Sequence, residues 1–165
     1  MLKKTLTASL LSVGLIAAMP QVQAEALTVN VARVTLDVAN KIAMEAVMAC
    51  REKGIPISAT VVDRNGIVQS QVRDTTAPPV SLSISQKKAY TAVMFNAKGS
   101  QLTRQAEGAL PTLGEGLAFM AGSVTIEGSG KLFGAIGVSG APDGMVDEEC
   151  AAAGVASVQD DLDML

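Results

Sequence analysis

Residues 57–73 read ISATVV-DRNG-IVQSQVR, and this stretch decides the fold. Its two outer runs are rich in the β-branched residues that favour strands. Asn65 followed by Gly66 is a strong hairpin signal, because both residues tolerate the positive φ that a tight turn requires. Strands joined by such a turn must be antiparallel. The stretch therefore predicts an antiparallel hairpin at residues 57–62 and 67–73.

Helices are predicted before and after this hairpin in the sequence. Apolar residues recur at helical spacing between residues 38 and 50, with Thr35 as an N-cap and Gly54 as a stop. A second helix follows the hairpin and ends near residue 97. It begins at Ser83, which forms a capping-box pattern with Gln86, or one turn earlier at Ser81. A short helix at residues 100–107 comes next.

The remainder of the chain is rich in glycine and β-formers. It predicts strands at residues 117–120, 124–127 and 132–138, with a Gly-Ser-Gly turn at residues 128–130. Asp143 caps a final helix over residues 145–158, and alternation at residues 26–34 indicates a further short strand. We therefore predict a single α/β (α+β) domain, in which helices pack on a five-stranded, mostly antiparallel sheet.

The N-terminus has the three-part layout of a secretory signal. Lys3 and Lys4 precede an uncharged, mainly apolar run at residues 6–18, and Ala24 ends a cleavage pattern. The run is shorter than the roughly 20 residues that span a bilayer, although a retained N-terminal anchor is the alternative. We expect a signal peptide at 1–24, an N-terminal extension at 25–34 and the domain at 35–165. The mature protein would be periplasmic or secreted, with no membrane insertion after cleavage.

Composition excludes several classes of function. Without the two signal lysines, the chain has 11 Lys and Arg residues and 16 Asp and Glu residues, which gives a net charge of −5. An acidic chain with one tyrosine and no tryptophan lacks the basic surface and stacking platforms of a nucleic-acid binder. The chain contains no histidine, which excludes Ser-His-Asp systems and His-ligated metals. Cys50 and Cys150 are either a disulfide or two buried thiols.

The order and spacing of several motifs resemble a known family. They are residues 57–63 with Asn65-Gly66, the segment at 72–74, Ser81, residues 88–92 with Phe95, and the GAIGVSG run at 134–140 with Asp147-Glu148. The chain resembles the GlcG/HbpS-like haem-binding family, also labelled haem-degrading, which includes the C-terminal domain of PduO-type adenosyltransferases. The resemblance covers residues 35–158. It departs from the family pattern at residues 73–77 and 121–126, and a histidine that some members place on haem has no counterpart.

The resemblance implies an antiparallel α/β domain, often homo-oligomeric, that binds haem or another small organic ligand. Arg73 and Lys88 are cations suited to hold carboxylates, with Ser139 and the Gly140 amide as neutral donors. The ligand-binding candidates are Arg73, Ser81, Lys88, Thr91, Ser139 and Gly140. The alternatives are a surface ion pair of Arg73 with Asp74 or another acid and a Lys88 side chain that snorkels along its helix.

Haem iron would need an unusual ligand in a chain without histidine. Tyr90 and Met94 are four residues apart on one helix face and are the first iron-ligand candidates. A cysteine or a weak oxygen ligand such as Thr91 is the other option. The alternatives to iron ligation are a packing role for Tyr90 and a core-filling role for Met94. The acids at residues 147–149 would bind a hard cation or form a solvated helix start.

These observations predict an exported small-ligand-binding protein for haem or a small organic carboxylate, in a carrier, sensor or accessory role. An enzyme of haem or small organic acid breakdown is the alternative, although no paired acid–base system is evident. A further alternative is an accessory subunit that docks a protein partner.

Overall fold

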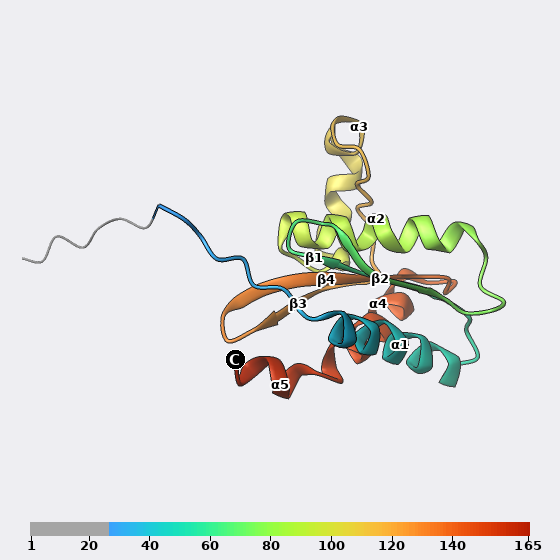
Figure 1. The fold of residues 1–165 in the computed structure, drawn as a ribbon. Helices are drawn as coiled ribbons and strands as arrows, with labels where there is room; N and C mark the ends of the chain where they lie inside the picture. Colours follow the sequence, from blue (N-terminus) through green and yellow to red (C-terminus); the bar gives the residue numbers. More distant parts are fainter. Residues whose placement is uncertain (1–26) are drawn as a thin grey trace, which may run out of the picture. The chain divides into compact units, whose positions relative to one another are not determined.

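An antiparallel sheet is the centre of the computed structural model, which describes residues 27–165 (Figure 1). Its strands are β1 Ser58–Asp63, β2 Val68–Arg73, β3 Ser123–Gly128 and β4 Lys131–Ser139. They lie in the order β2-β1-β4-β3, and each neighbouring pair is antiparallel. The sheet therefore has four strands, and the prediction of five is wrong. The predicted signal peptide at 1–24 lies outside the described residues.

Helices cover both faces of the sheet (Figure 1). They are α1 Leu36–Glu52, α2 Val80–Phe95, η1 Gly99–Glu107, α3 Leu110–Leu113, α4 Gly144–Ala156 and α5 Gln159–Asp163. Helix α2 packs on β1 and β4 from one side, while α1 and α4 pack against each other and against the sheet from the other. The result is a three-layer α+β domain over residues 31–165. Among the described residues, no helix is long and apolar enough to cross a membrane.

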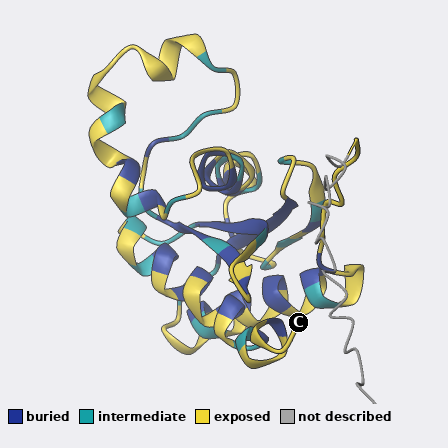
Figure 2. Cartoon of the chain, turned by 90° about the vertical axis from the view of Figure 1, so that its left-hand side faces the viewer, coloured by how far each residue is buried: buried dark blue, intermediate teal, exposed yellow. Residues whose placement is uncertain are grey.

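Strand β1 lies at the centre of the packing, and all six of its residues are buried (Figure 2). Ala59 and Val61 join the larger apolar cluster formed with α1 and α4. Val62 faces the other way and joins a smaller cluster with alanines of α2. The side chains of β1 alternate between the two faces of the sheet, so Ala59 and Val61 lie toward α1 and α4, while Ser58 and Thr60 lie toward α2.

The layer between α2 and the sheet is partly polar. Ser58 of β1 shares a hydrogen bond of 2.7 Å with Ser81 of α2, and Thr60 shares one of 2.7 Å with Ser85. A Cβ at Gly137 of β4 would lie only 2.1 Å from the carbonyl oxygen of Ser85. The glycine in this strand is therefore required by the close approach of the α2 backbone.

The predicted turns and two of the predicted caps are confirmed. Gly66 in the first hairpin has φ of 80°, and Ser129 and Gly130 in the second have φ of 49° and 71°. The second turn has two residues and needs positive φ at both, whereas in the longer first turn Gly66 adopts it and Asn65 does not. Thr35 and Asp143 each accept a hydrogen bond from a backbone amide in the first turn of α1 and α4 respectively.

The predicted strand at residues 117–120 does not form. The amide of Ala118 donates to Thr91 Oγ1 at 2.7 Å, and the Phe119 ring meets the Phe95 ring edge-on at a centroid distance of 5.2 Å. This short apolar run therefore packs on α2, an outcome that periodicity alone cannot distinguish from a strand. The predicted strand at 26–34 is also wrong for its described part, because residues 27–34 contain no strand.

The predicted start of α2 is wrong as well. The helix begins at Val80 after Pro79, with no side-chain cap. Ser81 and Ser83 lie inside the first turn, where their hydroxyls donate to the carbonyl oxygens of Pro78 and Val80. The final helix also differs from the prediction, because it ends at residue 156 and a separate short helix, α5, follows.

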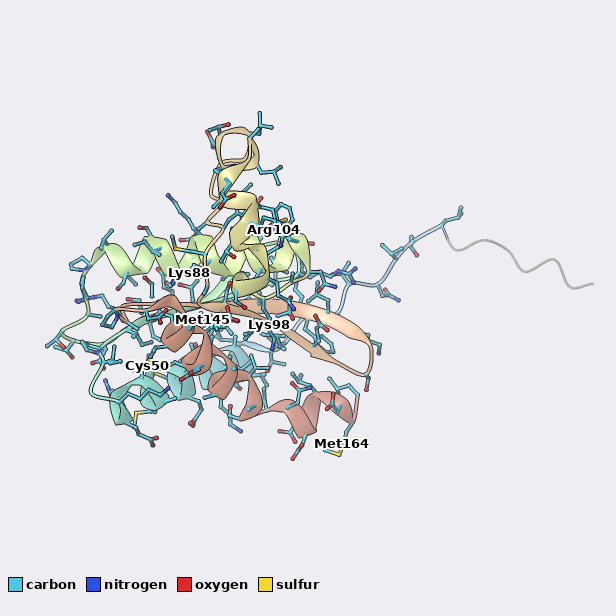
Figure 3. The ribbon with its side chains drawn as sticks, turned by 180° about the vertical axis from the view of Figure 1, so that it is seen from behind. Cys50, Lys88, Lys98, Arg104, Met145 and Met164 are labelled. Carbon is cyan, nitrogen blue, oxygen red and sulfur yellow. A yellow bond between two sulfur atoms is a disulfide. The ribbon has the colours of Figure 1, made fainter. Side chains whose placement is uncertain are left out.

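A disulfide between Cys50 and Cys150 joins α1 to α4, so the alternative of two buried thiols is wrong. Both side chains lie inside the larger apolar cluster, and Cys50 is labelled on α1 in Figure 3. The bond connects residues 100 positions apart in the sequence. It therefore fixes the packing of the two helices that cover one face of the sheet.

Candidate functional site

Three surface hollows lie along α2. The Lys88 hollow, of about 400 Å³, lies between α2, residues 119–121 and the start of α4, and is lined by Lys88, Ser139, Asp143 and Asp147 among others. The Tyr90 hollow, of about 380 Å³, is lined by Gly66, Ser83, Gln86, Lys87, Tyr90, Glu115 and Gly116. The Met94 hollow, of about 590 Å³, is lined by Arg64, Val93, Met94, Asn96, Glu127, Gly130, Lys131 and Leu132.

The Lys88 hollow contains a buried ion pair. Lys88 Nζ lies 2.8 Å from Asp147 Oδ2 and donates to the carbonyl oxygen of Val138 at 3.0 Å. Both charged side chains are 3% exposed. Lys88 therefore does not snorkel toward solvent, and its charge is already matched by a carboxylate of the same chain.

Asp147 occupies the anion site predicted at the turn after β4. Its Oδ1 accepts from the Ala141 amide at 2.9 Å, and the Gly140 amide also donates to the carboxylate. Burial raises the pKa of Asp147, and Lys88 and the two amides oppose that rise without cancelling it. The backbone donors that the sequence assigned to a ligand thus hold a carboxylate of α4.

Arg73 lies at the end of β2 and does not line the Lys88 hollow. Its Nη1 donates to the carbonyl oxygens of Ala77 at 2.6 Å and Thr75 at 3.3 Å. The predicted alternative of a pair with Asp74 is wrong, because Asp74 binds Arg51 through two hydrogen bonds of 2.7 and 3.0 Å. The hydrogen bond from Arg51 lowers the pKa of Asp74. The structure therefore does not bring Arg73 and Lys88 together in one pocket.

Ser81 and Thr91 are both buried and both bonded within the domain. The Ser81 hydroxyl lies against Ser58, while Thr91 Oγ1 donates to the carbonyl of Lys87 at 2.8 Å and accepts from the Ala118 amide. Ser139 differs from them, because it borders the Lys88 hollow. Of the six ligand-binding candidates, only Lys88 and Ser139 therefore line the Lys88 hollow.

The acids at the start of α4 do not form a solvated cluster. Glu148 is buried and accepts from the amide and hydroxyl of Ser100 at 2.9 and 2.5 Å and from the Gly122 amide at 3.1 Å. Glu149 is exposed and pairs with Lys53. The described part of the chain contains no group of three or more acids, histidines or cysteines placed to hold a metal ion.

Tyr90 and Met94 lie on the same face of α2 beside the first hairpin turn. A Cβ at Gly66 would come within 2.5 Å of the Tyr90 ring and 3.1 Å of the Met94 methyl group. The two side chains nevertheless border different hollows. Met94 is 42% exposed, so it is not the core filler of the alternative interpretation.

The Met94 hollow combines a soft ligand with two cations. The register places Asp63 opposite Gly134, which brings the β1–β2 and β4–β3 turns to the same end of the sheet. Arg64 in the first turn and Lys131 at the start of β4 therefore line one hollow together with Met94, near the end of α2. Val93 and Leu132 are apolar lining residues of the same hollow, and Glu127 is an acidic one. Sequence reasoning missed both cations, because only the strand register shows that these turns meet.

Comparison with known proteins identifies the family. The sequence model of a family described as "Haem degrading protein HbpS-like" matches residues 34–156. This chain belongs to that family. A crystal structure of HbpS is 36% identical, with a TM-score of 0.76 over 83% of this chain and 99% of the HbpS chain. A double mutant of Streptomyces reticuli HbpS is 35% identical, with a TM-score of 0.76 over 86% of this chain and 98% of the mutant chain.

A further solved structure, of lower sequence identity, shares the fold of this HbpS-like chain. A crystal structure of a PduOC–haem complex is 22% identical, with a TM-score of 0.70 over 76% of this chain and 94% of that chain. The resemblance to the PduO C-terminal domain is therefore confirmed at the level of the fold. No curated protein matches the chain.

Proposed function

We propose that this HbpS-like chain binds haem and that the Met94 hollow is its site. The observation that carries the proposal is the half-exposed Met94, whose hollow is also lined by Arg64 and Lys131. The hollow of about 590 Å³ falls within the usual volume range of small-molecule sites. The family description and the haem complex of a protein with the same fold support this choice of ligand.

The residues of the Met94 hollow fit the chemistry of an iron porphyrin. Thioether sulfur is a known axial ligand of haem iron, and Arg or Lys pairs with carboxylates such as the haem propionates. Arg64 and Lys131 would hold the propionates, and Val93 and Leu132 would contact the porphyrin plane. Bound haem would supply a redox-active iron. The absence of histidine from the chain excludes a bis-His or His-Met spectrum from one copy.

A haemin titration of the Met94→Leu variant tests the site. Wild type should show a Soret shift that saturates at one equivalent, and the substitution should weaken binding by at least about tenfold, as loss of a metal-site interaction commonly does. Leucine roughly conserves the side-chain volume, so the fold should survive. Met145→Leu is the matched control, because Met145 is also about half exposed but lies on α4. A Met94→Leu spectrum and affinity equal to wild type would contradict the assignment.

The Tyr90 hollow favours a second candidate ligand, a small organic carboxylate. Lys87, Gln86, Ser83 and the Tyr90 side chain line it, and its volume of about 380 Å³ is smaller. In the haemin titration, Tyr90→Phe distinguishes the two hollows, because it should leave haem bound at Met94 unchanged. Saturable binding of a small carboxylate that Tyr90→Phe abolishes, with no haemin binding, would favour this candidate instead.

We propose that the haem-binding role is that of a carrier, sensor or accessory protein. The family description makes haem degradation the competing function. Product analysis of the haem complex with a reductant separates the two. Unchanged haem supports a binding role, and an open-chain product would establish an enzyme.

We also propose that the protein is exported and cleaved after Ala24. The charged and apolar layout of residues 3–24 motivates this, and an internal disulfide is typical of proteins from oxidising compartments. N-terminal sequencing of the protein from an extracytoplasmic fraction should begin at Glu25. A dominant cytosolic species that begins at Met1 would refute export.

A further inference from the structure

The methionines of this protein have an unusual distribution. Six lie in the described part of the chain, and all six are at least 42% exposed. They are Met44, Met48, Met94, Met120, Met145 and Met164. Methionine is commonly among the buried residues of a globular protein, yet neither apolar cluster of this domain includes one. Figure 3 labels two of them, Met145 on α4 and Met164 near the C-terminus.

These thioethers are the most readily oxidised groups on the surface. Both cysteines of the chain are joined in a buried disulfide, so no thiol competes for an oxidant. The chain has no tryptophan or histidine and a single tyrosine. Methionine is converted to its sulfoxide by peroxides, and cellular reductases reverse the change.

We propose that the six exposed methionines are oxidation sites that take up oxygen from a peroxide while the fold stays intact. In each event the O–O bond of hydrogen peroxide breaks, and one oxygen bonds to the thioether sulfur. Sulfur loses two electrons, and the second oxygen leaves as water. Because sulfoxide formation damages proteins mainly by placing a polar group in a core, a core without methionine is insulated from it.

Met94 connects this chemistry to ligand binding, and this step rests on the proposed haem site. Its oxidation would replace a soft, apolar thioether with a polar sulfoxide beside Val93 and Leu132. Haem binding should therefore weaken after peroxide treatment and recover after reduction. The other five methionines line neither the Met94 hollow nor the Tyr90 hollow.

Peptide mapping by mass spectrometry tests the oxidation sites on the ligand-free protein. N-acetylmethionine amide, added to the same tube, serves as the reference for a fully accessible methionine. When hydrogen peroxide has oxidised this reference completely, each of the six positions should carry one oxygen. Thermal unfolding should remain cooperative. An Ile42→Met variant is the control, because residue 42 is fully buried and its sulfur should react far more slowly. A native methionine that resists oxidation, or loss of cooperative unfolding, would overturn the proposal.

Haemin titration of the oxidised protein tests the connection to Met94. Affinity should fall by about tenfold or more in wild type and Met145→Leu, and methionine sulfoxide reductases A and B together should restore it. An unchanged affinity after complete oxidation at residue 94 would refute the connection while leaving the haem site in place. If unoxidised wild type binds no haemin, the proposed function fails, and peptide mapping still decides the oxidation sites.

Discussion

Replacement of both cysteines in a Cys50→Ala/Cys150→Ala variant should lower the free energy of unfolding by about 2–5 kcal/mol. The disulfide joins residues 100 positions apart, so it removes considerable freedom from the unfolded chain. It also links α1 to α4, which together cover one face of the sheet. The double variant is preferred to a single one, because it leaves no reactive thiol.

Urea unfolding of wild type and the double variant, followed by circular dichroism, measures this loss. Wild type reduced in denaturant should approach the stability of the variant. Equal midpoints for the oxidised protein and the variant would mean that the bond is absent from the purified protein or contributes nothing. A stable disulfide would also agree with the proposed export, since such bonds persist in oxidising compartments.

The sequence predicted the parts of the fold that depend on local signals. Asn65-Gly66 and Ser129-Gly130 are typical of hairpin turns, and Gly66, Ser129 and Gly130 adopt the positive φ that such turns favour. The run at 117–120 was misassigned, because four apolar residues suit a strand and a segment packed on a helix equally well. Its true partner is Thr91 of α2, which lies 27 residues away from Ala118 in the sequence.

The candidate site could be predicted only in part for a similar reason. Helical spacing alone places Tyr90 and Met94 on one face of α2. The two cations of the Met94 hollow come from the first hairpin turn and from the start of β4, and only the pairing of β1 with β4 shows that these places meet. Lys88 was expected to be available to a ligand, but its partner Asp147 lies 59 residues away and no local pattern connects them.

The Lys88–Asp147 ion pair makes the second large prediction. Lys88→Met should destabilise the fold by about 3–5 kcal/mol, because it leaves a buried carboxylate without its cation. Lys53→Met is the matched control, since Lys53 pairs with Glu149 at the surface and its loss should cost only about 0–1 kcal/mol. Chemical denaturation at pH 7 measures both variants. A Lys88→Met variant as stable as Lys53→Met would show that the buried pair contributes little.

The dependence of this loss on pH identifies Asp147 as its cause. Burial already raises the pKa of Asp147 above its usual 3.8, and removal of Lys88 removes the main group that opposes the rise. A carboxyl group whose pKa is raised by folding destabilises the folded state. This penalty is complete at pH values above the raised pKa. The penalty then disappears as the pH falls through the raised pKa toward 3.8, where the unfolded chain also binds the proton. The stability difference between Lys88→Met and wild type should therefore shrink as the pH falls from 7 toward 3.8, and a Lys88→Met/Asp147→Leu variant should show no such dependence. A difference that stays constant over this range would assign the loss to packing around the lysine stem and not to the uncompensated carboxylate.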